Sequence, residues 1–189
     1  MSSEFQETIS MPGGQDRAAE ALLYVAWECR NATRFGQTKL HKILWRADFR
    51  SFSERGSPIT GRRYQRLPQG PCLQEMLPLQ GDLAAKGLIE IHEIELGSGF
   101  VEERVVPTIR PEQSLLNDRD LYFLDEAIEH YWDKTARETS DESHGAAWRT
   151  HGDRDPLPYE LALLSDENPD DEQLRRLEIL GQRRRWQSA

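Results

Sequence analysis

The stretch TKLHKILWRADFRSFSERGSPITGRRYQRLPQGPCLQ, residues 38–74, decides the fold of this chain. Its first half predicts a helix over residues 38–54, because apolar residues recur at intervals of three and four. Gly56 and Pro58 then supply the stop signal. Two adjacent rows of mostly apolar side chains run along this helix. One row is Leu40, Ile43, Leu44 and Ala47, and the other is His41, Trp45, Asp48 and Phe52. We expect this helix to be buried on two sides and to form the centre of the domain.

A third face of the same helix is basic, since four cations lie three, four and four residues apart. The loop that follows adds three arginines. Residues 30–66 hold ten basic and two acidic residues, a net charge of +8, so the rest of this −9 chain carries −17. Such a block predicts a surface that meets a negatively charged partner. Pairing of half of these arginines with acids elsewhere in the chain is an equally good interpretation. The candidate partner-binding residues are Lys39, Lys42, Arg46, Arg50, Arg62, Arg63 and Arg66.

The segments on either side of the central helix are also patterned. A helix over residues 15–29 precedes it, and residues 57–70 form an ordered loop or a short extended segment. Pro71 suits the first turn of a further helix, which we expect to reach Lys86 with a break or kink at Pro78 and Gly81.

From residue 88 the period changes from helix to strand. Residues 88–106 predict a β-hairpin that turns at residues 97–99, and a shift in its apolar alternation hints at a bulge. Asn117 should cap the next helix. Shorter helices are expected at residues 134–143 and 171–185. The predicted fold is therefore mainly α with a small antiparallel β-hairpin (α+β), in one compact helical domain.

The sequence gives no positive support to an enzymatic function. The histidines at positions 41, 92, 130, 144 and 151 lack metal-site spacing, and neither a nucleophile elbow nor a phosphate-binding loop is present. Cys72 is expected just inside a helix N-terminus, where a thiol pKa can fall, although a packing role is favoured. Cys29 and Cys72 predict free, buried thiols, because the chain begins without a signal peptide. We expect a cytoplasmic protein that has no catalytic residue, metal, cofactor or membrane partner.

Two segments resemble the Panacea domain, the family that includes SocA-like antitoxins. In residues 38–74 the matching positions are Lys39, Leu40, Lys42, Leu44, Trp45, Ala47, Gly56, Pro58, Ile59, Tyr64, Gly70 and Pro71. In residues 123–148 they are Lys134, Ala136, Ser140, His144 and Trp148. Thr139 departs from the pattern, since the family usually has Leu there. The resemblance covers residues 15–165, with a flexible N-terminus at 1–14 and a C-terminal helical extension at 166–189.

The resemblance implies a compact helical domain with a small β element. It also implies an antitoxin that neutralises a cognate bacterial or phage toxin by direct binding, commonly a toxin encoded by the adjacent gene. Some SocA-like members act as adaptors that deliver a toxin to a protease. These implications come from the family, and the residues themselves add a charged recognition face to them.

A winged-helix DNA-binding regulator is the alternative, because helices followed by a hairpin have the element order of that fold. The hairpin carries Glu90, Glu93, Glu95, Glu102 and Glu103. Nucleic acid is the less favoured partner, since the phosphate backbone would repel an acidic wing.

His144 and Trp148 are expected to pack the C-terminal helices onto the second helix.

Overall fold

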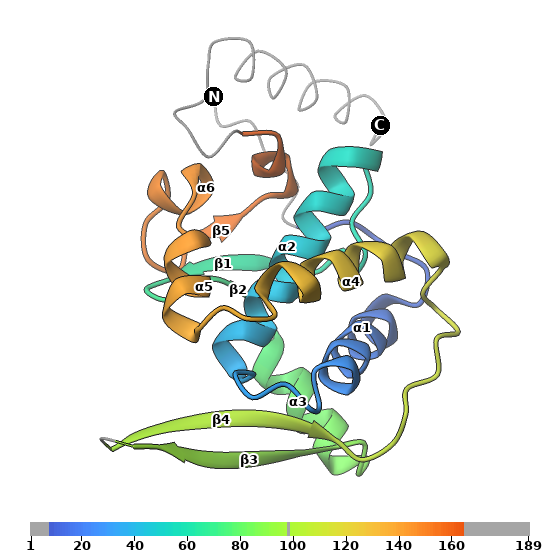
Figure 1. Ribbon diagram of the computed structural model, residues 1–189. Helices are drawn as coiled ribbons and strands as arrows, with labels where there is room; N and C mark the ends of the chain where they lie inside the picture. The colour runs from blue at the N-terminus through green and yellow to red at the C-terminus, as the bar shows by residue number, and fades with distance from the viewer. Residues whose placement is uncertain (1–7, 98, 165–189) are drawn as a thin grey trace.

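The computed structural model describes residues 8–97 and 99–164 of the chain (Figure 1). Over these residues the fold is α+β, as predicted. The α-helices are α1 (Gly14–Glu28), α2 (Gln37–Arg55), α3 (Met76–Ala85), α4 (Asp118–Tyr131), α5 (Ala136–Glu142) and α6 (Ala146–Arg149). The strands are β1 (Tyr64–Leu67), β2 (Gly70–Leu73), β3 (Ile89–Leu96), β4 (Phe100–Pro107) and β5 (Pro156–Leu157), and η1 is a 3-10 turn (Tyr159–Leu163). The helix expected at residues 171–185 and the first half of the expected N-terminal segment, residues 1–7, lie outside the described residues.

Helix α2 is the centre of the fold, as its two apolar rows predict. It crosses the middle of the molecule and contacts α1, α4, α5, β2 and η1 (Figure 1). Leu40, Ile43 and Ala47 are almost completely buried in this position. The helix ends where Gly56 adopts the left-handed conformation, with φ of 70°.

Helices α1 and α4 are joined by a buried cluster of charges. The Arg17 guanidinium pairs with Asp120, and Arg55 from the end of α2 pairs with the second oxygen of the same carboxylate. Asp120 is also the third residue of α4, where it completes the capping box that Asn117 begins. The predicted cap is therefore confirmed, and its acidic partner also connects three helices.

A sheet that the sequence did not predict lies beside α2. Strand β1 pairs antiparallel with both β2 and β5, so the strand order is β2-β1-β5. Pro71 lies in β2 opposite Arg66, which corrects the expected helix start at this residue. Gly70 precedes it with φ of 99°, a conformation that glycine adopts without strain.

Helix α3 begins at Met76, later than expected, and runs through Pro78 and Gly81 without a break. Pro78 is the third residue of this helix. The first N–H groups of a helix have no partner within it, so a proline there removes no hydrogen bond. The predicted interruption is therefore wrong.

The hairpin of β3 and β4 confirms the prediction for residues 88–106. Its register is continuous from Ile89 opposite Pro107 to Leu96 opposite Phe100, so the expected bulge is absent from the described ladder. Ile89 and Val105 are buried at the base, whereas the far half of the hairpin extends beyond the helices (Figure 1).

Asp48 connects the separate parts of the core. Its fully buried carboxylate accepts hydrogen bonds from the N–H groups of Ile59 and Thr60 at 2.7 Å and from the Tyr64 hydroxyl at 2.8 Å. Tyr159 of η1 packs against Phe52, with the two rings tilted by 35°, and its hydroxyl approaches the same carboxylate at 3.5 Å. Helix α2, the following loop, β1 and η1 thus meet at one buried acid.

Candidate functional site

The two lysines of the predicted basic face lie inside the protein. Both are 2% exposed. Lys39 Nζ donates to the carbonyl oxygen of Trp132 at 2.9 Å, and Lys42 Nζ donates to that of Pro71 at 2.8 Å. The expectation that four cations share one open face is therefore wrong for these two, because their long stems reach across to neighbouring elements and bury the ammonium groups.

Arg46 and Arg50, one and two turns further along α2, remain partly exposed and share one acid. The Arg46 guanidinium contacts both oxygens of Glu126, at 2.8 and 3.3 Å, and Arg50 donates to the same carboxylate at 2.8 Å. Arg50 also pairs with Glu54. Burial alone would raise the pKa of Glu126, but the hydrogen bond and charge of Arg46, with the charge of Arg50, hold that pKa below its usual value.

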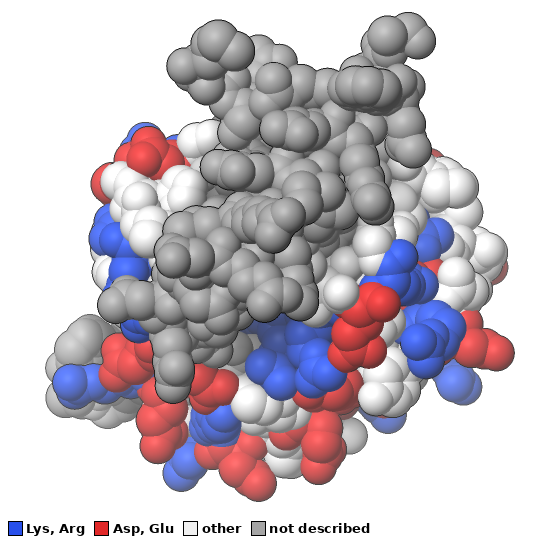
Figure 2. Space-filling view, turned by 90° about the horizontal axis from the view of Figure 1, so that it is seen from above, with Lys and Arg blue, Asp and Glu red and all other residues white. Residues whose placement is uncertain are grey.

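The three arginines that follow α2 lie half-buried at or near β1. Arg62 pairs with Glu75, and Arg66 lies 3.7 Å from a carboxylate oxygen of Asp153. Pairing with acids elsewhere in the chain is thus confirmed for Arg62 and Arg66 as well as for the α2 arginines. On the face that Figure 2 shows, basic and acidic side chains lie side by side.

His144 and Trp148 were expected to pack the C-terminal helices onto the second helix. In the structure they join α6 to β1 instead. The two rings stack with centroids 3.8 Å apart, and Arg66 lies over the Trp148 ring at 4.0 Å. The Trp148 indole N–H donates to the carbonyl oxygen of Leu67 at 2.7 Å. These matching positions of the family pattern have a structural role in the contacts described.

The exposed arginines of α2 border a groove of about 210 Å³, which we call the arginine groove. Trp45 and Phe49 line it from α2, with ring centroids 3.4 Å apart. The opposite wall comes from α4, α5, α6 and η1 and is lined by Tyr131, Glu142, Ser143, Gly145, Ala146, Ala147, Leu161, Ala162 and Leu164. Aromatic side chains next to arginines are the combination that most often carries binding energy in protein interfaces.

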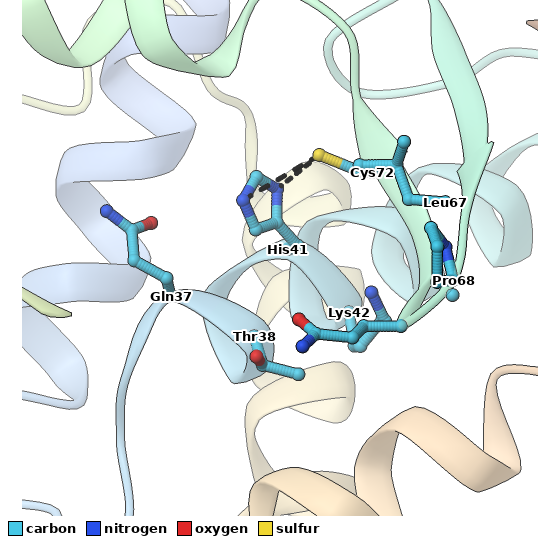
Figure 3. A pocket seen from close by; sticks show the side chains of 9 residues that line it. Gln37, Thr38, His41, Lys42, Leu67, Pro68 and Cys72 are labelled. Atoms are coloured by element: carbon cyan, nitrogen blue, oxygen red, sulfur yellow. Dashed lines mark hydrogen bonds between the residues drawn. The ribbon is translucent and has the colours of Figure 1, made fainter. Parts of the chain in front are cut away.

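A second pocket, of about 360 Å³, lies between the start of α2 and the turn that joins β1 to β2 (Figure 3). The Cys72 thiol faces His41, with Sγ 3.1 Å from Nδ1, and Lys42 lies alongside. Burial lowers the pKa of His41 to about 3 and raises that of Cys72 to about 11, although the Lys42 charge partly opposes the second shift. Near neutral pH both groups are therefore uncharged, and this pair provides no thiolate nucleophile.

Cys72 therefore differs from its predicted setting, because it lies on β2 and its pKa rises. Both cysteines are free and buried, as predicted. Among residues 8–97 and 99–164, no group of three or more histidine, cysteine or acidic side chains is arranged to hold a metal ion. Within the same residues, no helix combines the length and the apolar character that a membrane crossing requires.

Sequence reasoning identified the arginines but missed Glu126 and the far wall of the arginine groove. No local pattern marks Glu126 as their partner, because the pairing arises only where α4 crosses α2. The apolar residues of η1 likewise reach the groove through the return of the chain past β5.

Comparison with known proteins agrees with the resemblance. A family model described as antitoxin SocA-like, Panacea domain, matches residues 40–149, which is more than half of the chain. Comparisons with curated proteins and with solved structures gave no match. The matched region contains most of α2, both hairpins, α3, α4, α5 and α6. The chain belongs to the SocA-like antitoxin family with a Panacea domain, a family that is generally non-catalytic.

Proposed function

We propose that this protein is an antitoxin that binds its cognate toxin directly in the cytoplasm and thereby neutralises it. Membership of the SocA-like family carries the proposal. The family implies a toxin partner, and the gene adjacent to that of this protein is the first place to look for it.

The arginine groove supports the proposal as the surface that meets the toxin. Arg46 and Arg50 are held by Glu126 in a fixed arrangement, so little side-chain freedom is lost when a partner binds. Trp45 and Phe49 provide an apolar floor beside them. Acidic groups around the toxin's active site are the expected counterpart of the guanidinium groups, since arginine binds carboxylates through paired hydrogen bonds.

The other predicted partner-binding residues divide into two groups. Arg62, Arg63 and Arg66 are half-buried at or near β1 and are proposed as secondary contacts. Lys39 and Lys42 are proposed to act indirectly, by supporting the helix that presents the arginines, because their ammonium groups are buried.

Co-expression with the product of the adjacent gene tests the proposal. We expect the neighbour to stop growth when it is expressed alone, and this protein both to restore growth and to co-purify with the neighbour. A harmless neighbour that does not co-purify would contradict the proposal.

The same experiment separates direct neutralisation from delivery to a protease. In the first case the toxin persists at its normal level in a stable complex. In the second case growth recovers while the toxin disappears, and its half-life returns to normal in a strain that lacks the protease. The adaptor mechanism is the family-based variant of the proposal, and the toxin half-life distinguishes the two.

A further inference from the structure

The hairpin of β3 and β4 offers a sheet surface that no other described element covers. Strand β4 lies on the side of α1 and α2, and β3 contacts α3 near its base. In residues 8–97 and 99–164 the sheet contains just these two strands, so the outer edge of β3 has no strand partner there. The far half of the hairpin extends past the helices (Figure 1). Exposed strand edges of this length readily accept an additional strand.

One face of this far half is partly apolar. Cross-strand pairs place Ile91 opposite Val105 and Glu95 opposite Val101, so these side chains point to the same face. Val105 is buried at the base, but Ile91 is 40% exposed and Val101 is 56% exposed. Two exposed apolar side chains are ordinary on a protein surface, so the charge on this face carries the argument.

The same face carries negative charge that nothing described neutralises. Glu93 lies directly opposite Glu103 in the ladder, and both are exposed. Like charges at directly opposed positions destabilise a strand pair. Among the described residues no cation lies within ion-pairing distance of Glu93, Glu95 or Glu103. Arg104, the sole Lys or Arg in residues 89–107, points to the other face and donates to the carbonyl oxygens of Cys29 and Arg30.

We infer that this face, formed by Ile91, Glu93, Glu95, Val101 and Glu103 and called here the hairpin face, binds an extended basic segment of a partner protein. In that segment Lys or Arg would alternate with apolar residues. A strand added at the edge of β3 repeats its side chains every second residue, so one set of side chains meets the hairpin face. Its cations lie beside Glu93 and relieve the repulsion between Glu93 and Glu103, and its apolar residues pack beside Ile91.

A second copy of this chain is a poor occupant of the same surface. Pairing two β3 edges would bring the acidic side chains of both copies together, and like charges across an interface cost affinity. The inferred surface is separate from the arginine groove and has the opposite charge. It extends the proposed function, since a toxin with a basic extended segment would engage it, but its chemistry is testable without any toxin.

The first test uses peptides on the isotope-labelled full-length protein. The probe is a short peptide that alternates lysine and valine, and the matched control has the same composition with its lysines and valines in separate blocks. We expect the alternating peptide to shift the amide resonances of residues 89–96 and to bind about tenfold more tightly than the block peptide. Equal affinity for the two peptides, or shifts confined to other parts of the protein, would overturn the inference. Self-association through β3, detected by sedimentation, would also overturn it.

Paired substitutions test the charge itself. The double variant Glu93→Gln, Glu103→Gln removes the repulsion, so its melting temperature should be no lower than that of the wild type, while its affinity for the alternating peptide falls about tenfold. The control variant Glu112→Gln, Glu129→Gln removes two exposed acids elsewhere and should bind as the wild type does. Unchanged affinity in the hairpin variant would refute the inference, because loss of folding is measured separately.

The proposed function and the inference about the hairpin face can fail independently of each other. If the adjacent gene product proves harmless, the proposed function fails, but the peptide titration still decides whether the hairpin face binds basic segments. If the toxin is neutralised equally well by the hairpin variant while the peptide result holds, the face serves another basic partner.

Discussion

The Nζ atom of Lys39 donates a hydrogen bond to the carbonyl oxygen of Trp132 at 2.9 Å, and Trp132 is the C-cap residue of α4. A cation at a helix C-terminus meets carbonyl groups that have no partner inside the helix, and it interacts favourably with the helix dipole. The lysine of the family pattern thus joins the start of α2 to the end of α4. Its role is in the fold, which explains how a basic residue occupies a buried position.

We expect Lys39→Met to lower the free energy of unfolding by about 1 kcal/mol, because methionine fills the space of the stem but leaves the carbonyl unpaired. Chemical denaturation measures the change. The exposed Lys86 provides a control, since Lys86→Met removes the same charge without a buried hydrogen bond. Equal stability of the two variants would show that the bond to Trp132 contributes nothing.

Because of Lys42, we expect the free energy of unfolding to change with pH in the alkaline range. Burial lowers the pKa of its ammonium group from 10.5 to about 8. Between these values the unfolded chain binds the proton more tightly than the folded protein, so stability rises with pH in this window. Relative to Lys42→Met, the wild type should gain up to about 3 kcal/mol between pH 8 and pH 10.5, and the difference should be constant below pH 8.

Denaturation curves for both proteins at a series of pH values measure this gain. The difference between the proteins isolates Lys42, because every other titrating group is shared. Parallel pH profiles would mean that the folded protein does not change the pKa of Lys42.

The arginine groove predicts a salt-dependent interface. Arg46→Glu, Arg50→Glu should weaken the toxin complex by about tenfold or more at low salt, with a smaller loss at high salt, because the reversed charges repel an acidic partner. Titration calorimetry at two ionic strengths measures both affinities.

Glu126→Gln is the matched control for this interface. It removes the negative charge that the two guanidinium groups share and leaves both arginines and the Arg50–Glu54 pair in place, so binding should be retained even if stability falls. Wild-type affinity in the double arginine variant would exclude the groove from the interface.

We expect even a nearly isosteric substitution of Asp48 to destabilise the fold strongly. Asp48→Asn replaces one acceptor oxygen by a donor NH₂ group in a site where two N–H groups and two hydroxyls already donate. We expect the free energy of unfolding to fall by about 3 kcal/mol. Tyr159→Phe, which removes the hydroxyl that donates to the carbonyl oxygen of Arg62, should cost about 1 kcal/mol. Thermal unfolding ranks the two variants, and an equal loss would contradict the central role of Asp48.

Local pattern was sufficient for α1, α2, the start of α4 and the long hairpin. The period of three to four residues predicted α1 and α2, and the alternation after Leu88 predicted β3 and β4. Asn117 was correctly identified as a cap because capping depends on neighbours within the next turn. The short strands β1, β2 and β5 have too few residues for a period to appear, and they form because distant segments pair.

The candidate site was harder to predict than the fold, because it depends more on contacts between segments that are distant in sequence. Helical spacing placed Lys39 and Lys42 on one basic face with Arg46, but spacing does not say what another helix or strand brings to that face. The carbonyl oxygens of Trp132 and Pro71 are far away in sequence and determine the burial of the lysines. One useful signal was present in the sequence: Asp48 lies in an otherwise mostly apolar and aromatic row, as a buried and fully bonded acid does.

The position of Tyr159 has a consequence for how the protein is made. Asp48 lies in the first third of the chain, yet the aromatic ring that packs on Phe52 and covers this acid comes from residue 159. A ribosome releases the N-terminal half first, so the central helix leaves the exit tunnel long before its last covering element does. During that interval Phe49 and Phe52 lack a neighbour on one side. The newborn chain therefore completes this part of its core late in its own synthesis, and the arginine groove, whose far wall includes residues of η1, is finished only then.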